Sequence, residues 1–323
     1  VAMLSFVLRR LGQSSVLVLI MSILVFVGMY VVSDPVAVLA SDDFTEQDRI
    51  ALASELGVDR PLMVQYFSFL SNVVRGDFGT SFVYNEPVLP LIVERLPATL
   101  EVAFLAIAIG LCIGVPLGIY SGLNRKKKTT KTISFLTTVG YSIPNFWQAL
   151  LLILVFAVWL KVLPASGRGD TTTLFGIELS FFNLDGLRHM LLPAINLAIY
   201  KICMQTRLAQ SGTQEVMFQD YMTFARAKGI PRPRLIRRHL MRNTLIPIVT
   251  ITGLELGGLI AFSTVTETVF SWPGIGKLLL DSIHNADRPV VVAYLILIVM
   301  MFVVINFVVD VLYALLDPRI RYT

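Results

Sequence analysis

The sequence predicts an all-α polytopic membrane protein with six transmembrane helices and both termini in the cytoplasm. Composition, long apolar runs and the placement of basic residues lead to this prediction. Apolar residues make up 55% of the 323 residues and charged residues only 15%, and the mean hydropathy is +0.72. A soluble domain carries roughly 25% charged residues to cover its surface. The composition therefore excludes a soluble enzyme, a disordered protein and a disulfide-stapled secreted domain.

The predicted spans are long apolar runs, because a helix in lipid must satisfy its backbone hydrogen bonds internally. Five runs are clear, and a sixth is shorter and contains Asn196 and Lys201. In chain order the predicted spans are residues 15–32, 100–123, 133–160, 190–205, 245–265 and 290–316.

Basic residues support the shorter span, 190–205. With six spans, 17 of the 27 lysines and arginines fall on inner segments, as the positive-inside rule requires. Without this span, the basic clusters at 125–131 and 207–242 would lie on opposite sides. The first run follows basic residues, as the apolar part of a signal peptide does, but its apolar core of roughly 18 residues exceeds the 7–15 residues of a typical signal. We therefore expect it to remain as a span.

The segment after the first span, residues 34–97, is acidic. It holds ten acidic residues and four arginines, a net charge of −6. Its spaced apolar positions predict short helices that form a small outer cap; a solvated loop and a docking surface for an outside partner are both compatible with it. The predicted organisation is a tail and first span (1–33), the outer segment (34–97) and a five-helix core (98–323) with an inner loop at 207–244.

Catalytic motifs are missing from the sequence. The nearest match to a phosphate-binding loop is Gly276-Lys277, where Leu278 occupies the position of the required hydroxyl residue. The three histidines are scattered, and no cysteine pair has zinc spacing. Cys112 and Cys203 lie in predicted spans, so no disulfide is expected. We expect neither ATP binding nor a metal site nor enzymatic catalysis in this chain.

Five ionisable residues lie in or near the spans: Glu101, Lys201, Glu255, Glu267 and Asp310. A charge at mid-membrane costs at least ~2.5–3.5 kcal/mol, so each is expected to face a cavity, a partner or the interface. Lys201 and Glu255 lie on the fourth and fifth predicted spans and form a candidate ion pair. A structural pair and a role in a water-filled path both fit this pattern.

Glycines in the second span repeat every four residues, at Gly110, Gly114, Gly118 and Gly122. This spacing places them on one stripe of the helix, where another helix backbone can approach closely. The sequence therefore predicts a tight helix–helix contact along this stripe.

Proline at position 144 predicts a kink or a break in the third span, because it removes a helical hydrogen bond. Broken backbone at membrane depth occurs where it is buried in protein or lines a cavity. The candidate translocation-path residues are Pro144, Lys201, Glu255 and Glu267.

The inner segment between the fourth and fifth spans predicts a short amphipathic helix. Residues at helical spacing are expected to form one face: Met217, Tyr221, Phe224, Ala225 and Lys228. Gly229 is placed as a C-terminal cap, and two prolines follow it. An aromatic face with small alanines fits a groove on another protein, and an interfacial helix on anionic lipid fits it equally.

The same segment resembles the coupling loop of ABC importer permeases, in the dipeptide, oligopeptide and nickel branch. The similar residues there are Asp220-Tyr221, 225–229, Arg238-His239, Arg242-Asn243 and 245–247. Further similar stretches are residues 6–12, 57–61, 76–79, 96–101, 266–276 and 316–322. The resemblance therefore runs almost end to end.

The resemblance implies the type I ABC importer permease fold in a bacterial inner membrane, with a periplasmic cap. It implies a second similar permease, two ATP-binding subunits that carry ATP and magnesium, and a periplasmic solute-binding protein. Residues implied in ATPase coupling are Met217, Asp220, Tyr221, Phe224, Ala225, Ala227, Lys228 and Gly229. A peptide is the expected substrate, with nickel and glutathione as alternatives, and no nucleic acid partner is expected.

Two other classes of function compete with this interpretation. An ion-coupled secondary transporter would use Lys201, Glu255 and Glu267 as relay groups, and a membrane scaffold would only anchor soluble partners. Neither alternative predicts a helix that fits a groove on an ATPase.

Overall fold

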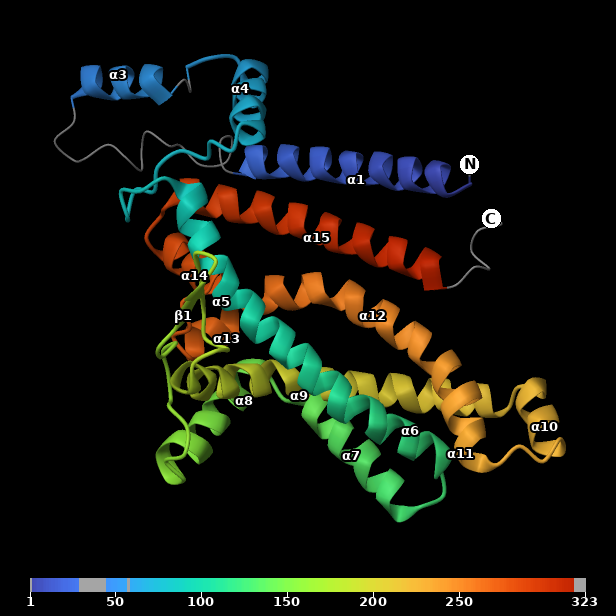
Figure 1. Cartoon of the computed structure of the whole chain (residues 1–323). Coiled ribbons are helices and arrows are strands. Elements are labelled where there is room, and N and C mark those ends of the chain that lie inside the picture. Colours follow the sequence, from blue (N-terminus) through green and yellow to red (C-terminus); the bar gives the residue numbers. More distant parts are fainter. Residues whose placement is uncertain (1, 29–44, 57–58, 317–323) are drawn as a thin grey trace. The chain divides into compact units, whose positions relative to one another are not determined.

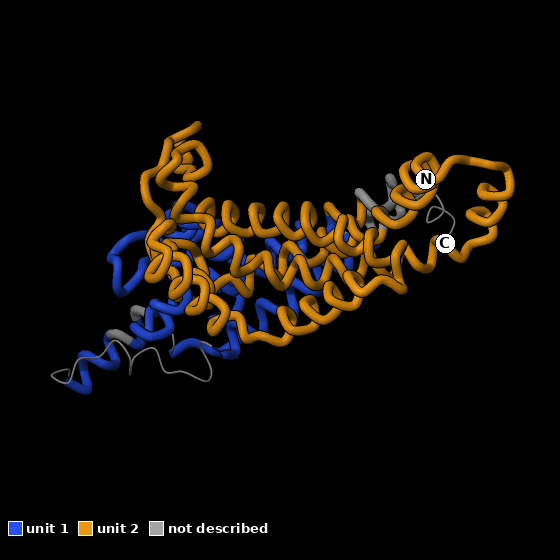
Figure 2. Tube along the Cα trace, turned by 90° about the horizontal axis from the view of Figure 1, so that it is seen from below, with its two compact units in different colours: residues 1–95, 278–307, 322 blue, residues 96–277, 308–321, 323 orange. Residues whose placement is uncertain are grey.

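The computed structural model describes residues 2–28, 45–56 and 59–316, and most of them are helical (Figure 1). The chain divides into two compact units, which Figure 2 colours separately. Unit 1 contains residues 1–95 and 278–307, and unit 2 contains residues 96–277 and 308–321. The boundaries predicted from the sequence, at 33 and 97, stay a prediction.

Unit 1 is helical, and three of its helices, α1, α4 and α15, share a small buried cluster with two phenylalanines. Its elements are α1 (Ala2–Phe26), α3 (Glu46–Leu56), α4 (Leu62–Val74), the start of α5 (Val88–Ile109), most of α14 (Ile275–His284) and most of α15 (Arg288–Leu316). Phe26 of α1 and Phe69 of α4 are buried together with Val292 and Ile296 of α15. The outer segment thus forms helices α3 and α4 on its described residues, as predicted.

Unit 2 contains the long helix α9 (Leu184–Met217), whose 34 residues extend about 51 Å at 1.5 Å per residue. Before α9 come the end of α5, η2 (Gly110–Gly114), α6 (Val115–Leu123), α7 (Lys128–Ser142), α8 (Asn145–Leu152), η3 (Ile153–Trp159), β1 (Thr172–Leu174) and β2 (Ile177–Leu179). After it come α10 (Asp220–Ala227), α11 (Arg232–Arg234), η4 (Leu235–Leu240), α12 (Met241–Phe262), α13 (Thr264–Val269), the start of α14 and the end of α15.

Three helical stretches of the described chain are long and apolar enough to cross a membrane. They are Val88–Leu123, Arg232–Phe262 and Arg288–Val311, and they match the predicted spans 100–123, 245–265 and 290–316. The first predicted span begins in α1, and its residues 29–32 lie outside the described part. The predicted span 190–205 lies within α9, which is not among the three.

The predicted third span, 133–160, forms two helices that meet at 105°. Ile143 has extended backbone, with φ −76° and ψ 127°, and Pro144 precedes the first residue of α8. Proline disfavours a helical conformation at the residue before it, so α7 ends at Ser142. The kink or break predicted at Pro144 is therefore confirmed.

The glycine stripe of η2 and α6 forms the predicted tight helix–helix contact, and its partner is α9. A Cβ atom at Gly114 would lie 2.8 Å from the carbonyl oxygen of Ile202, and one at Gly122 would lie 2.6 Å from Cβ of Thr213. These distances are shorter than van der Waals contact. Only glycine therefore lets the two helix backbones come this close.

Candidate coupling and translocation sites

The predicted amphipathic segment is divided between two helices. The long helix α9 ends at Met217, Gln219 has extended backbone, and α10 begins at Asp220. The Asp220 carboxylate lies in the first turn, where it favours a helix start because the N-terminal end of the helix dipole is positive. The expectation of a single helical face from Met217 to Lys228 is therefore wrong at Met217.

Gly229 ends α10 with the predicted left-handed cap. Its φ is +72°, a conformation that costs residues with a Cβ atom free energy. The Gly229 N–H donates to the Arg226 carbonyl over 2.9 Å, and the Ile230 N–H donates to the Ala225 carbonyl over 3.3 Å. This pair of bonds is the Schellman arrangement, so the predicted cap is confirmed.

One face of α10 packs inward. Met222 and Ala225 are buried in a cluster with Val216 of α9 and with Leu235 and Leu240 of η4. Ala225 was expected on the outward face, and that placement is wrong because α10 turns this side toward α9 and η4. A displacement of α10 is thereby linked through side-chain packing to both neighbouring elements.

The opposite face of α10 is aromatic and exposed. Phe224 is 61% exposed and Tyr221 is 41% exposed. The Lys228 ammonium lies 4.5 Å from the centre of the Phe224 ring, and the Asn243 side-chain amide donates to the Tyr221 hydroxyl over 3.0 Å. The exposed residues of the predicted coupling set are Asp220, Tyr221, Phe224, Ala227, Lys228 and Gly229.

Phe218 adds to this surface and was missed by sequence reasoning. It lies in the turn between α9 and α10 and is 74% exposed. The Arg125 guanidinium lies 5.8 Å from the centre of its ring. Because Phe218 lies in a turn, helical spacing does not group it with the residues of α10. The one signal in the sequence is an apolar residue two positions before Asp220.

A cavity of about 490 Å³ opens in unit 2, between the α7–α8 break, α9 and α12. Lys201 and Glu255 line it, and the Lys201 ammonium donates to a Glu255 carboxylate oxygen over 3.0 Å. The predicted ion pair is therefore confirmed. Pro144 itself does not line the cavity, but its neighbours Ile143 and Asn145 do, because the break turns them inward.

Polar side chains at one end of the cavity form a hydrogen-bonded cluster. The Gln148 amide donates to the carbonyl oxygen of Asn196 over 2.8 Å. The side-chain amides of Asn145 and Asn196 each donate to the Thr266 hydroxyl over 3.0 Å. In the sequence, Asn196 is only a polar residue in the shorter predicted span; its hydrogen-bond partners come from elements far apart in the sequence.

Glu267 lies outside this cavity and is fully buried. Its carboxylate accepts hydrogen bonds from the Thr99 hydroxyl (2.7 Å), the Ser263 hydroxyl (2.8 Å) and the Lys277 N–H (2.9 Å). Burial raises the pKa of the Glu267 carboxyl, and these hydrogen bonds act in the opposite direction. The carboxylate thus joins α13 to α5 and α14.

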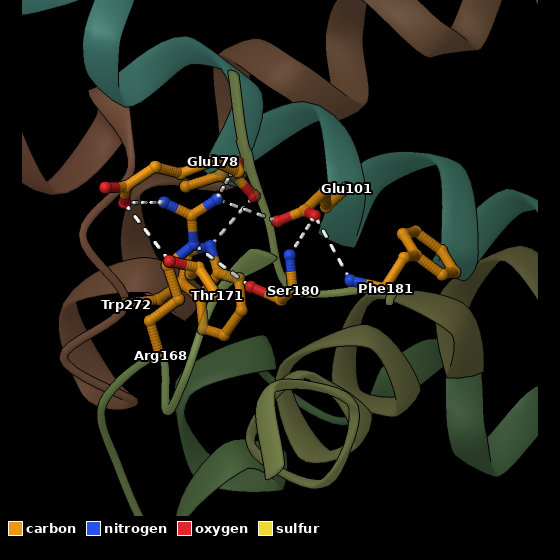
Figure 3. A network of polar contacts seen from close by, with 8 residues as sticks. Glu101, Arg168, Thr171, Glu178, Ser180, Phe181 and Trp272 are labelled. Atoms are coloured by element: carbon orange, nitrogen blue, oxygen red, sulfur yellow. Dashed lines mark hydrogen bonds and ion pairs between the residues drawn. The ribbon is translucent and has the colours of Figure 1, made fainter. Parts of the chain in front are cut away.

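Glu101 belongs to a second buried polar network, which Figure 3 shows. The Arg168 guanidinium donates to Glu101 over 3.0 Å, to the Ser180 hydroxyl over 3.1 Å and to the Glu178 carbonyl over 2.7 Å. It also lies 5.9 Å from the centre of the Trp272 ring. Glu101 was expected to face a cavity, a partner or the interface, and its partner is Arg168. Because Arg168 also bonds the Glu178 carbonyl of β2, the pair anchors the β1–β2 hairpin to α5.

The long apolar helices of the described chain are those of an integral membrane protein, and the cavity with its buried ion pair gives it space for a small ligand. Two family models match the chain. The model described as binding-protein-dependent transport system inner membrane component matches residues 114–322, and the model of its N-terminal part matches residues 3–103. The chain belongs to this family of binding-protein-dependent transport components.

Curated relatives match the chain over almost its whole length. The dipeptide transport system permease protein DppB of Escherichia coli K12 is 36% identical over 337 residues, covering 99% of both chains. The oligopeptide transport system permease protein AppB of Bacillus subtilis 168 is 38% identical, covering 99% of this chain and 100% of its own. The di/tripeptide transport system permease protein DppB of Pseudomonas aeruginosa UCBPP-PA14 is 37% identical, covering 99% of both.

Solved structures share the fold. A chain of the MetNI methionine ABC transporter in an inward-facing conformation aligns with a TM-score of 0.59 at 19% identity. The alignment covers 72% of this chain and 99% of that chain. The expected ABC importer permease fold is thereby confirmed.

Proposed function

We propose that this chain is the permease subunit of an ATP-driven ABC importer that carries di- or oligopeptides across a bacterial inner membrane. The observation that carries the proposal is the full-length similarity, at 36–38% identity, to three relatives named as peptide transport permeases. Transport by alternating access shifts the population between inward-open and outward-open states. The chain itself then catalyses no reaction.

In this proposal the aromatic face of α10 docks into a groove on one ATP-binding subunit. Phe224, Tyr221 and Lys228 supply an apolar and cationic surface that fits helix-in-groove recognition. Met222 and Ala225, on the other side of the helix, pass its movement to α9 and η4. ATP and magnesium bind to the two ATP-binding subunits and not to this chain.

The remaining partners and the topology follow the same proposal. A second, similar permease completes the translocation path, and a periplasmic solute-binding protein delivers the peptide to the outer side, where residues 34–97 form a cap. Six spans with both termini inside place α10 in the cytoplasm. The candidate path residues Lys201 and Glu255 line the cavity from this subunit.

Uptake into proteoliposomes tests the proposal. The assembled transporter, with its binding protein, is given a panel of radiolabelled di- and oligopeptides, glutathione and nickel, with and without ATP on the side of α10. We expect ATP-dependent uptake of peptides that persists when ionophores collapse the ion gradients. Uptake that needs a gradient and no ATP would instead indicate a secondary transporter.

Phe224→Ala tests the coupling surface, since Phe224 is exposed whereas Ala225 is buried. We expect peptide uptake to fall about tenfold or more, while the melting temperature of the complex is unchanged. Thr223→Ala, at an exposed position of the same helix, is the matched control and keeps normal uptake. Normal uptake by Phe224→Ala would contradict the docking of α10.

A further inference from the structure

The cavity of unit 2 holds one positive and one negative charge. Of the described residues that line it, only Lys201 and Glu255 carry formal charges. Their side chains are 7% and 17% exposed, and they form one ion pair at 3.0 Å. The cavity is therefore electrically neutral as a whole, although it contains both kinds of charge.

Fold stability gives little reason for this pair. Removing two charges from water costs several kcal/mol per ion, and apolar side chains of similar volume often stabilise a protein as well or better. The pair also has open space beside it: a Cβ atom at Gly258, one turn after Glu255 in α12, would have no neighbour within 4 Å. A ligand therefore has room next to the carboxylate.

The lysine is held from two sides. Its Cβ lies 2.7 Å from where a Cβ of Gly110 would be, so the first carbon of the Lys201 side chain packs directly against the glycine stripe. Its ammonium lies 5.6 Å from the centre of the Tyr200 ring, and Tyr200 stacks on Tyr141 with centroids 4.9 Å apart. These contacts place the ammonium at the cavity wall even when its carboxylate partner moves.

The rest of the cavity offers groups that match peptide bonds. Asn145, Gln148 and Asn196 line it, and their amide groups are both donors and acceptors. The volume of about 490 Å³ lies within the roughly 300–1,000 Å³ of small-molecule sites. A fully extended dipeptide spans at most about 7 Å, so it fits in such a space.

We infer that Lys201 and Glu255 recognise the two charged ends of a short peptide. Lys201 binds the α-carboxylate and Glu255 binds the α-ammonium, so one ion pair within the protein is exchanged for two between protein and peptide. A zwitterion leaves the cavity neutral, whereas a ligand with a net charge adds an unpaired charge in a region of low dielectric constant. This inference rests on the proposed peptide transport, and it identifies the two charged termini as the part of the peptide that the cavity recognises.

Calorimetric titration of the assembled transporter in nanodiscs, without the binding protein, tests the inference. The probes are dialanine, N-acetyl-dialanine, which lacks the ammonium, and dialanine amide, which lacks the carboxylate. We expect the wild type to bind dialanine at least tenfold more tightly than either capped probe. Glu255→Gln should lose the preference over N-acetyl-dialanine alone, and Lys201→Met the preference over dialanine amide alone.

The double variant Lys201→Met/Glu255→Gln separates recognition from a structural role. If the pair only stabilises the fold, removing both charges leaves none unpaired, and dialanine binding and uptake stay at the wild-type level. That outcome, or equal affinity of the wild type for all three probes, overturns the inference and leaves the proposed function standing. If the wild type shows no ATP-dependent peptide uptake in proteoliposomes, the proposed function fails and the inference with it.

Discussion

At the residue scale, buried charges in this protein are paired with partners from distant parts of the chain. Glu101 meets Arg168, Lys201 meets Glu255, and Glu267 accepts hydrogen bonds from Thr99 of α5 and Lys277 of α14 as well as from the nearby Ser263. The sequence identified four of these five charged residues, because a charge in or near an apolar run is costly. Arg168 was missed, since it lies in a loop where an arginine is unremarkable before the fold places it beside Glu101.

Glu267→Ala should destabilise the protein. The substitution leaves the Thr99 hydroxyl and the Lys277 N–H without this acceptor in a buried place, at about 1–3 kcal/mol for each unsatisfied group. We expect the melting temperature of the detergent-solubilised protein to fall by several degrees. Glu178→Ala, at a side chain that is 63% exposed, is the control, and an unchanged melting temperature for Glu267→Ala would contradict the structural role.

At the element scale, signals from single residues and signals from helical spacing had different outcomes. The break at Pro144 and the cap at Gly229 were predicted correctly, because proline and glycine act on their own backbone dihedrals. The face of α10 was predicted only in part. Helical spacing groups residues on a face, but which neighbour covers that face depends on packing with α9 and η4.

Gly118→Ala should disturb the packing of α6 on α9. The added Cβ would lie 2.5 Å from Cβ of Ala209 and even closer to the Thr206 carbonyl oxygen, and overpacking of this kind costs about 1–3 kcal/mol. We expect a lower melting temperature. Gly258→Ala is the matched helical control, since its Cβ would meet nothing within 4 Å, and its melting temperature should not fall; equal effects of both variants would contradict the role of the stripe.

At the scale of the whole molecule, the charge distribution predicts the orientation in the membrane. The positive-inside rule places the loop with α10 in the cytoplasm and the β1–β2 hairpin outside. Both segments present exposed aromatic residues: Phe218 is 74% exposed, and Phe175, at the tip of the hairpin, is 96% exposed.

Cysteine labelling tests this orientation. In a background with Cys112 and Cys203 replaced by alanine, Phe175→Cys should react with a membrane-impermeant maleimide added to spheroplasts. Phe218→Cys should react only in inverted vesicles or after permeabilisation. Labelling of Phe218→Cys in intact spheroplasts would contradict the six-span topology.

The membrane environment, most of the apolar helices, the contact stripe, the proline break and the family resemblance could all be predicted from the sequence. These features follow from local properties: an apolar run must be helical in lipid, and glycine and proline change the backbone at their own positions. Tertiary structure alone decided which side of α10 is covered, that Glu267 is sealed by hydrogen bonds, and that Asn145, Gln148 and Asn196 join the Lys201–Glu255 pair around one cavity. Burial and pairing depend on atoms that come together from distant positions in the sequence. The periodicity of residues along one helix does not show which other elements pack against that helix.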